Sequence, residues 1–416
     1  MDWSEMDLSA VRSAYAETVI RSGINAAEGQ PVLIRAETVQ ADFARALARE
    51  AYRAGARDVL LRYSDPVAAR IRLEESREPE YLEYVPEYTQ AFYDSVIDGN
   101  WASISLRGPE DPDVFEGADT ERLGRMQKAA RRAASDFLSA VSSNRISWNV
   151  CLSPTRPWAA KVLGDDAGED WEERIWEILL PILRLDADDP AGAWLKHDAE
   201  LKRRGAHMNE ARFDGVRFRG PGTDLFVGLR PDRVFAGGRC RAADGRMFFP
   251  NLPTEEIFST PDRARTSGRV ACTRPVEVMG TQVEGAWFRF EDGAVVDFGA
   301  DRNQETLGKY LDIDDGARFL GEVALVDVSS PIYRSGRIFY SILYDENAAC
   351  HIALGNGYPD CIEGGTEMDR DGLREVGCNV SLVHTDFMIG SEEVSVWGVR
   401  KDGGEEKVIE NGSFIV

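Results

Sequence analysis

The N-terminal third of the chain alternates short apolar runs with amphipathic stretches. Residues 31–35 (Pro-Val-Leu-Ile-Arg) are typical of a buried strand. Residues 40–55 carry apolar side chains at helical spacing and end on Gly55, and residues 58–63 form a second apolar run. Strand, helix and strand in such close succession predict a βαβ unit, and hence a parallel sheet.

The same alternation continues to about residue 152. Residues 101–106 and 146–152 have the pattern of strands, and residues 119–141 have the pattern of one long amphipathic helix. We therefore expect a Rossmann-like α/β N-terminal domain. No G-x-G-x-x-G motif follows Ile34, so we predict no dinucleotide site and interpret this domain as a scaffold.

The alternation of strands and helices gives way first to a helical stretch and then to short β-rich runs. Residues 171–204 are helical in character, with an acidic, proline-containing break at residues 186–190. Beyond Gly205, short β-rich runs such as 224–229, 286–290, 322–328 and 394–399 are separated by Gly, Asp and Pro. We predict two domains, an α/β scaffold over residues 1–187 and an α+β catalytic domain with a largely antiparallel sheet over residues 188–416.

Composition narrows the class of protein. The chain has 416 residues, of which 43% are hydrophobic and 29% charged, as in a globular protein with a large core. Its net charge is -23, from 72 acidic and 49 basic residues. This charge argues against nucleic acid as a partner. It favours solubility, or the attraction of cations and amine-bearing ligands into an acidic cavity.

The cysteines and the N-terminal residues indicate in which cellular compartment the protein is expected. The six cysteines, at positions 151, 240, 272, 350, 361 and 378, form no CxxC pair. The first residues are acidic and are followed by no apolar signal region. No segment approaches the ~18 apolar residues of a membrane span. We expect a reduced, cytoplasmic protein with free thiols and no membrane partner.

Histidine is scarce, with four residues in the chain. His197 lies in a charged helical segment, where we expect a surface position. His207 lies near a predicted helix end, where we expect a solvated or capping role.

His384 and Asp386 lie in the apolar segment 381–390, which has the pattern of a buried strand. Alternation along a strand places the two side chains on one face. A buried imidazole and carboxylate are costly unless they are paired or metal-bound. Mutual pairing and a metal site both account for them, because imidazole and carboxylate suit zinc and related ions.

His351 lies in a segment that we interpret as a short helix. Asp345 or Asn347 can cap that helix, and Gly355 can end it. A buried, hydrogen-bonded histidine and a metal ligand are both compatible with the pattern. Tyr358 follows in a turn that could aim its phenol at the same place, where phenols stabilise oxyanions.

Three carboxylates complete the candidate set. Glu322 opens the apolar strand 320–326, so it lies at an exposed strand end or is held by a cation. Glu255 and Glu256 lie between Pro253 and Pro261. They form either a capping pair at an exposed turn or a metal ligand with a neighbour that points elsewhere. With the two histidines, these carboxylates match a site for two metal ions.

Four segments resemble the M29 family of metallo-aminopeptidases. They are residues 251–258 (NLPTEEIF), 320–325 (LGEVAL), 345–353 (DENAACHIA) and 384–390 (HTDFMIG). The likeness extends over most of the chain. It implies a two-domain protein with a dinuclear site in its C-terminal domain. It also implies a homodimer that encloses a cavity, and activation by divalent ions such as Zn, Co, Mn or Mg.

The resemblance also implies roles for individual residues. The metal ligands would be Glu256, Glu322, His351, His384 and Asp386, and Glu256 is favoured over Glu255 by its distance along the chain from Glu322. Two further residues, Glu346 and Tyr358, match positions that the family uses at or beside the site, and we count Glu346 among the candidate ligands.

The function that follows from this resemblance is removal of the N-terminal residue of short peptides by a water molecule that two metal ions activate. Glu255 or Glu346 would carry the proton to the leaving amine, and Tyr358 would stabilise the oxyanion. We therefore expect peptide substrates for this chain.

A related branch of the same fold leaves an alternative. It contains mononuclear iron dioxygenases that open dihydroxypyridine rings and need only two histidines and one carboxylate. His351, His384 and Asp386 could supply that set. The additional carboxylates Glu256 and Glu322 favour two metals, and hence hydrolysis.

Overall fold

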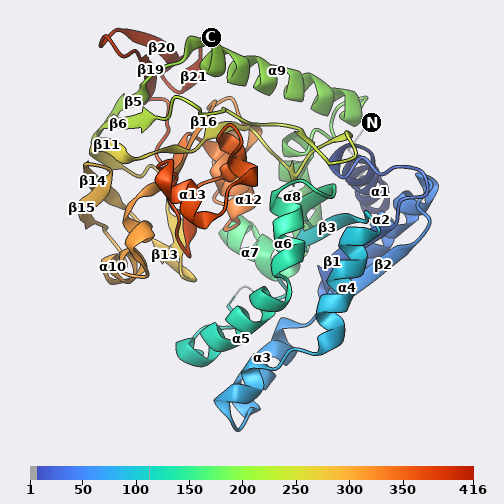
Figure 1. Cartoon of the computed structure of the whole chain (residues 1–416). Coiled ribbons are helices and arrows are strands. Elements are labelled where there is room, and N and C mark those ends of the chain that lie inside the picture. Colours follow the sequence, from blue (N-terminus) through green and yellow to red (C-terminus); the bar gives the residue numbers. More distant parts are fainter. Residues whose placement is uncertain (1–6, 112) are drawn as a thin grey trace. The chain divides into compact units, whose positions relative to one another are not determined.

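The computed structural model describes residues 7–111 and 113–416. These residues form two compact units, and Figure 1 labels many of their helices and strands. Unit 1 comprises the chain up to Trp194 together with Arg239–Leu252, and unit 2 comprises Leu195–Gly238 and Pro253–Val416.

Unit 1 is built on a five-stranded sheet in the order β2-β1-β3-β4-β9, in which every pair of neighbours is parallel. The strands are β1 (Val32–Glu37), β2 (Val59–Ser64), β3 (Ala102–Arg107), β4 (Trp148–Leu152) and β9 (Asn251–Leu252). The predicted parallel α/β sheet is confirmed.

Both faces of this sheet are covered. Leu33 packs with residues of α4 and α6, among them Val96 and Phe137. Val32 and Ile34 point to the opposite face and have no exposed surface either. The helices of the unit are α1 (Leu8–Thr18), α2 (Ala41–Arg53), α3 (Pro66–Glu75), α4 (Glu87–Asp98), α5 (Thr120–Ala133), α6 (Ser135–Ser142), α7 (Arg156–Leu163) and α8 (Trp171–Ile182).

The remaining elements of unit 1 are short. They are the π-helical turn η1 (Val19–Gly23), the 3-10 turns η2 (Thr38–Gln40), η3 (Pro79–Glu83) and η4 (Gly164–Asp166), and the hairpin strands β7 (Cys240–Arg241) and β8 (Met247–Phe248).

The strand order reverses between β1 and β3, where open α/β sheets commonly bind ligands. Side chains of the unit occupy this position. Gln40 Nε2 donates to the carbonyl oxygens of Arg107 (2.6 Å) and Gly108 (2.9 Å). The Glu37 carboxylate accepts from the Glu110 N–H at 2.8 Å. The loops after the two strands are thus bound to each other.

The single helix predicted over residues 119–141 is wrong, because two helices cover this segment. Ala134 leaves the helical conformation between α5 and α6, with φ -107° and ψ 10°. The two helices differ in environment: α5 has no buried residue, whereas α6 buries Phe137 and Ala140 in the core. The break lets α6 turn its apolar face to the sheet.

Unit 2 begins within the long helix α9 (Pro190–Ala211) and contains an antiparallel sheet in the order β15-β14-β11-β6-β5-β19-β20-β21. Its strands are β5 (Gly215–Gly220), β6 (Thr223–Leu229), β11 (Pro261–Ala271), β14 (Trp287–Glu291), β15 (Ala294–Gly299), β19 (Ser395–Val399), β20 (Glu405–Glu410) and β21 (Ser413–Phe414). The predicted antiparallel character is confirmed.

A second, four-stranded antiparallel sheet has the order β10-β16-β17-β18. Its strands are β10 (Glu256–Ser259), β16 (Leu320–Val326), β17 (His351–Gly355) and β18 (His384–Met388). One face of this sheet contributes Ile257, Val323, Leu325, Ile352 and Phe387 to the main core of the unit.

The shorter elements of unit 2 connect these sheets. They are the hairpin β12 (Val276–Val278) and β13 (Thr281–Val283), the helices α10 (Gln304–Leu311), α11 (Pro331–Arg334), α12 (Ile342–Asp345) and α13 (Arg370–Glu375), and the 3-10 turns η5 (Asp315–Arg318), η6 (Glu346–Ala348), η7 (Pro359–Cys361) and η8 (Gly365–Glu367). All six cysteines are free thiols, as predicted. Across the described residues, no helix has the length and apolar character needed to cross a membrane.

Candidate metal centre

One face of the four-stranded sheet carries the candidate ligands. Glu322 pairs with Ala353, and Ala353 pairs with Asp386 on the next strand. Paired residues of an antiparallel sheet point to the same side, so these side chains share a face. His351, His384 and Glu256 fall on it by alternation along their own strands. Residues of opposite parity enter the apolar core.

Small residues occupy the positions between the ligands. Ala324 pairs with His351, Ala353 lies between Glu322 and Asp386, and Gly355 pairs with His384. None of these three residues has a side chain larger than a methyl group. The imidazoles and carboxylates therefore have room in the middle of this face of the sheet. The sequence alternates large apolar residues for the core with small residues for the site.

His351 lies on a strand, so the helix predicted around it is wrong. The helical signal belongs to the preceding segment, where α12 and η6 cover residues 342–348. Ala349 is already extended, with φ -155° and ψ 167°. Every residue of β17 is buried, and the strand pairs on both sides. Pairing between two neighbours outweighs the local preference of a short segment.

A bulge at Gly321 sets the direction of Glu322. The register between β16 and β17 shifts by one residue there, so that Leu320 pairs with Leu354. Leu320 consequently joins the core while Glu322 faces the site. A Cβ at position 321 would lie 2.2 Å from the Asn356 carbonyl oxygen, so glycine is required.

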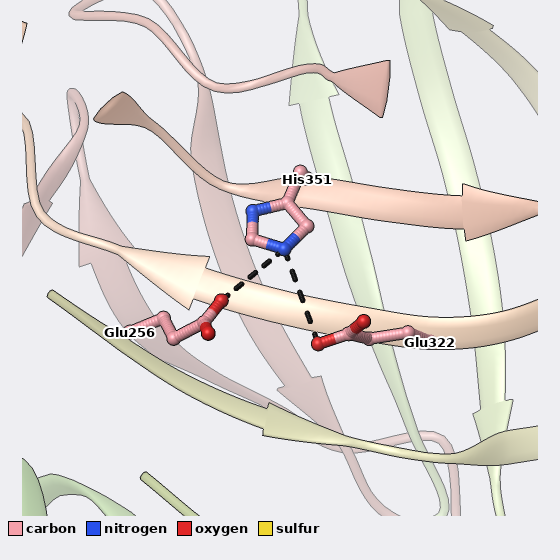
Figure 2. Close-up of side chains that lie close together, drawn as sticks. All are labelled: Glu256, Glu322 and His351. Carbon is pink, nitrogen blue, oxygen red and sulfur yellow. Dashed lines mark ion pairs between the residues drawn. The ribbon is translucent and has the colours of Figure 1, made fainter. Parts of the chain in front are cut away.

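The ligand atoms form two overlapping groups. Glu256, Glu322 and His351 make up one, which Figure 2 shows, and Glu322, His384 and Asp386 make up the other. Within each group the ligand atoms lie within 4.8 Å of one another. Glu322 belongs to both groups, so its carboxylate lies between them.

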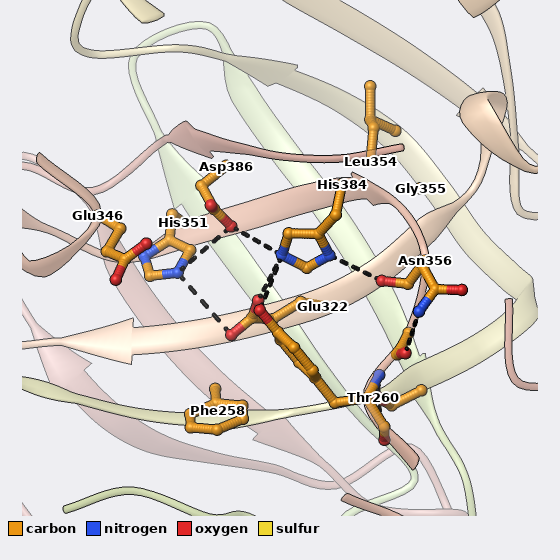
Figure 3. Close-up of polar contacts among 12 residues, drawn as sticks. Phe258, Thr260, Glu322, Glu346, His351, Leu354, Gly355, Asn356, His384 and Asp386 are labelled. Atoms are coloured by element: carbon orange, nitrogen blue, oxygen red, sulfur yellow. Dashed lines mark hydrogen bonds and ion pairs between the residues drawn. The ribbon is translucent and has the colours of Figure 1, made fainter. Parts of the chain in front are cut away.

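The shortest contacts in the centre join imidazole Nε2 atoms to carboxylate oxygens (Figure 3). His351 Nε2 lies 3.2 Å from Glu256 Oε2, as Figure 2 shows, and 3.9 Å from both Glu322 Oε1 and Asp386 Oδ1. His384 Nε2 lies 3.2 Å from Glu322 Oε2 and 3.4 Å from Asp386 Oδ1.

Backbone carbonyls fix the orientation of both imidazoles. His384 Nδ1 donates to the Asn356 carbonyl oxygen at 2.7 Å, and His351 Nδ1 lies 3.3 Å from the Ala349 carbonyl oxygen. A carbonyl oxygen can only accept a hydrogen bond, so Nδ1 of His384 must carry a proton and donate it to Asn356. The other ring nitrogen, Nε2, then faces the carboxylates. Metal-binding histidines are commonly held in this way.

Burial and crowding of charge shift the pKa values of the centre. Burial raises the pKa of Glu322 to about 7, and the charges of Glu256 and Asp386 contribute to this rise. The hydrogen bond from His384 lowers the pKa but does not outweigh them. Burial would lower the pKa of His351, but contact with Glu256 and the other carboxylates raises it to about 10. The centre concentrates negative charge and stabilises positive charge beside it.

Tyr358 lies beside His384, and Glu346 lies beside the other histidine of the centre, His351 (Figure 3). The Tyr358 hydroxyl is 3.2 Å from His384 Nε2, and its ring packs against Phe258 and His384. Burial and the carboxylates, Glu322 first, raise the pKa of Tyr358 well above its usual value, so the phenol keeps its proton. Glu346, half-buried on η6, lies beside the His351 ring in Figure 3.

Glu255 has a different environment from Glu256. Its carboxylate Oε2 lies 3.4 Å from His197 Nε2 on α9, and neither group of candidate ligands among the described residues contains it. The pair is buried and not at an exposed turn. The expected surface position of His197 is also wrong, because its side chain is 15% exposed and its Nε2 lies 2.9 Å from the Thr254 carbonyl oxygen.

Four polar residues support the centre in ways that the sequence did not indicate. They are Thr260, Asp314, Asn379 and Asn347, of which only Asn347 was considered before, as a helix cap. The buried Asn347 accepts from the Glu255 N–H at 2.6 Å and donates to the Leu343 carbonyl oxygen at 3.0 Å. Thr260 Oγ1 both accepts from the Tyr358 N–H and donates to the Tyr358 carbonyl oxygen.

Asn379 and Asp314 hold the chain before His384. Asn379 Nδ2 donates to the carbonyl oxygen of Gly355 (2.5 Å), and the Asp314 carboxylate accepts from the Leu382 N–H (2.6 Å) and the Ser381 hydroxyl (2.8 Å). In the sequence, Asn379 and Asp314 differ from their apolar and turn-forming neighbours only in being polar. Asparagine and aspartate are common in turns, so this difference does not indicate a role at the centre.

The M29 family, described as thermophilic metalloprotease, matches residues 10–414 of the chain. The chain belongs to the M29 family. This M29 protein is therefore a hydrolase of peptide bonds, as the sequence predicted.

Its curated relatives cover nearly the whole chain. Aminopeptidase T of Thermus aquaticus is 40% identical over 96% of this chain and 97% of its own length. Aminopeptidase 2 of Geobacillus stearothermophilus is 37% identical over 96% of both chains. The solved structure of wild-type AmpT from Thermus thermophilus superimposes with a TM-score of 0.90 at 38% identity, covering 98% of this chain and 100% of that one.

Proposed function

We propose that this M29 protein is a metal-dependent aminopeptidase that removes the N-terminal residue of short peptides. The names of its relatives support the exopeptidase activity. The observation that carries the proposal is the sharing of Glu322 between two groups of candidate ligands, one with Glu256 and His351 and one with His384 and Asp386. Such an arrangement suits two divalent ions, of Zn, Co, Mn or Mg.

The residues fit metal ions in two respects. Glu256 Oε2 and Asp386 Oδ1 are buried and, among the described residues, have no hydrogen-bond partner. Buried carboxylate oxygens without donors are costly, and a cation compensates them. Both imidazoles are held through Nδ1, so that each presents Nε2 to Glu322 and Asp386.

Bound at these residues, divalent ions would supply Lewis acidity, which lowers the pKa of water and polarises a carbonyl. Residues of the chain would bind the substrate and stabilise the oxyanion. Acidic side chains on the face attract the free ammonium group of a peptide. The phenol of Tyr358, which keeps its proton, donates to the oxyanion that forms when water adds to the scissile carbonyl.

A proton must then reach the leaving amine. Glu346 and Glu255 are the two candidates, and we favour Glu346 because its half-buried carboxylate lies beside His351. A carboxyl at the edge of the centre can take a proton from the attacking water and release it to the amine. Glu255 lies against His197, and we propose that this contact holds the first residues of β10 in place.

The dioxygenase alternative requires only His351, His384 and Asp386. It leaves Glu256 and Glu322 without a role, although both are buried against the same imidazoles.

We also propose that the protein acts in the cytoplasm, which its free thiols support. A homodimer is proposed from the family resemblance alone.

The decisive experiment combines metal analysis with an activity assay. The protein, loaded with Co²⁺, Zn²⁺ or Mn²⁺, is tested on a panel of aminoacyl-arylamides and on N-acetylated counterparts. We expect two ions per chain, cleavage of the free-amine substrates and no cleavage of the acetylated ones. One ion per chain and no amide cleavage with any metal would contradict the proposal.

A further inference from the structure

The turn that leads to Glu346 carries an apolar side chain that faces outward. Ile342 begins α12 and is 50% exposed, whereas Leu343, Tyr344 and Asp345 after it are buried. The Glu346 N–H donates to the Ile342 carbonyl oxygen, which is the hydrogen bond of one α-helical turn. Residues four apart in such a turn lie on one face. Ile342 therefore stands beside Glu346, whose side chain lies next to the His351 ring (Figure 3).

This turn is held rigidly from both sides. The buried Asp345 carboxylate accepts from the Phe339 N–H at 2.8 Å and the Ser341 N–H at 3.1 Å. Between them Tyr340 adopts a positive φ of 50°, which a non-glycine residue adopts only when its surroundings enforce it. On the other side Asn347 binds the Leu343 carbonyl oxygen and the Glu255 N–H. Ile342 is thus presented by a fixed backbone.

The charges of the centre orient a substrate relative to this side chain. Carboxylates concentrate at the Glu346 end, because Glu346 lies beside the His351 ring (Figure 3), whose Nε2 is 3.2 Å from Glu256 Oε2 and 3.9 Å from Asp386 Oδ1. The Tyr358 hydroxyl lies at the His384 end. A peptide with its ammonium group toward the carboxylates and its carbonyl toward Tyr358 places the side chain of its first residue at the Glu346 end.

We propose that Ile342 is a specificity-determining residue that forms an apolar wall for the side chain of the substrate's N-terminal residue. The proposal rests on the aminopeptidase function proposed above. It makes Leu, Met and Phe the preferred first residues over Gly. It also disfavours Asp and Glu, which would meet both the apolar wall and the acidic centre. An isolated exposed isoleucine is otherwise unremarkable, and its place one turn from Glu346 gives it this role.

The test measures kcat/KM of the metal-loaded full-length protein for leucyl-, phenylalanyl- and glycyl-arylamides. In Ile342→Ala we expect the preference for leucine over glycine to fall about tenfold, since lost apolar contact to a side chain weakens discrimination by about that much. Val296→Ala is the matched control, because Val296 is a 45% exposed β-branched residue on β15. The control should keep the wild-type preference.

Two further measurements separate the possible failures. Metal stoichiometry and thermal unfolding of Ile342→Ala should match the wild type, and Ile342→Trp should reduce cleavage of the phenylalanyl substrate more than that of the glycyl one. An equal loss on all substrates would mean that Ile342 only supports Glu346, and this would overturn the proposal. Absence of any cleavage by the wild type would instead overturn the aminopeptidase function.

Discussion

The carbonyl oxygen of Asn356 accepts a hydrogen bond from His384 Nδ1 at 2.7 Å, and this contact sets which nitrogen of His384 faces the carboxylates. Asn356 is itself bound to the chain before His384, since its N–H donates to the Val383 carbonyl oxygen and its Oδ1 accepts from the Ser381 N–H. The imidazole and the loop that orients it are thus one hydrogen-bonded assembly.

Glu322→Gln should abolish most activity, because Glu322 is the carboxylate common to both groups of ligands. We expect a fall in kcat of at least about 100-fold and loss of one or both bound ions per chain. Metal analysis of the purified variant and the arylamide assay measure these effects. Glu305→Gln, at an exposed position on α10, is the control and should retain both ions. Full activity of Glu322→Gln would rule out a shared carboxylate.

Tyr358→Phe should lower kcat more than it changes KM. The hydroxyl lies 3.2 Å from His384 Nε2, and we propose that it donates a hydrogen bond to the oxyanion. The oxyanion forms in the transition state, so this bond affects kcat more than substrate binding. Loss of one such donor typically costs about 100-fold in kcat. Steady-state kinetics on leucyl-arylamide give both constants, and Tyr88→Phe, at a 72% exposed residue of α4, serves as the control. A rise in KM alone would assign Tyr358 to substrate binding.

Asn347→Ala should destabilise unit 2 and weaken the centre together. Removing the side chain leaves the Glu255 N–H and the Leu343 carbonyl buried without their partner, at a cost of about 2 kcal/mol. Urea unfolding followed by fluorescence measures the loss, and metal titration measures the affinity. Asn347→Asp keeps the acceptor for Glu255 and should bind metal better than Asn347→Ala. Equal affinities in the two variants would contradict a role in placing the start of β10.

Gly321→Ala should disturb His384 from a distance. The new methyl group would lie 2.2 Å from the Asn356 carbonyl oxygen, which is backbone and cannot move alone. Asn356 would shift, and with it the acceptor that orients His384. We expect lower metal affinity and a lower temperature of unfolding than in Gly336→Ala, whose site has open space around it although its φ is 64°. Unchanged metal binding would show that the bulge tolerates a side chain.

Asp314→Asn should lower stability at neutral pH but not in acid. Burial would raise the pKa of Asp314, yet hydrogen bonds from the Leu382 N–H and the Ser381 hydroxyl outweigh it and hold that pKa below its usual value. Since the folded pKa lies below the unfolded one, the stabilisation is complete above the unfolded value of about 3.9 and is lost as pH falls through the folded pKa.

The measurement for Asp314 is the urea midpoint of wild type and variant at pH 6 and pH 3. The difference between the two proteins should be clear at pH 6 and should shrink at pH 3. Asp312→Asn, which removes an exposed partner of Arg318, is the control and should change the midpoint little. A difference that persists undiminished at pH 3 would show that the carboxylate's charge is not involved.

Local patterns in the sequence were sufficient for the parallel sheet of unit 1 and for the antiparallel character of unit 2. The set of candidate ligands came mainly from the family resemblance. Alternation placed His384 and Asp386 on one face of a strand, and the structure has them there. It failed for His351, because the signals that cap α12 and η6 lie directly before β17. Whether a five-residue segment forms a strand depends on two neighbouring strands, which local periodicity does not encode.

The supporting residues could not have been predicted in the same way. Asn347 lies 92 residues from Glu255, and Asp314 lies 68 residues from Leu382, although both pairs are hydrogen-bonded. In the sequence an asparagine or aspartate near a turn has the same pattern whether it faces water or binds distant backbone. The pairing of these residues follows from the register of β10, β16, β17 and β18, which becomes known only with the tertiary fold.

The four-stranded sheet keeps its ligands on one face and its large apolar residues on the other. The two sets share a backbone but no side chains, so the packing that holds the sheet together does not require the ions. Metal loading would then leave the apolar packing of the sheet unchanged. A chain without bound ions would keep that packing, and one ion could replace another without rearrangement of the core.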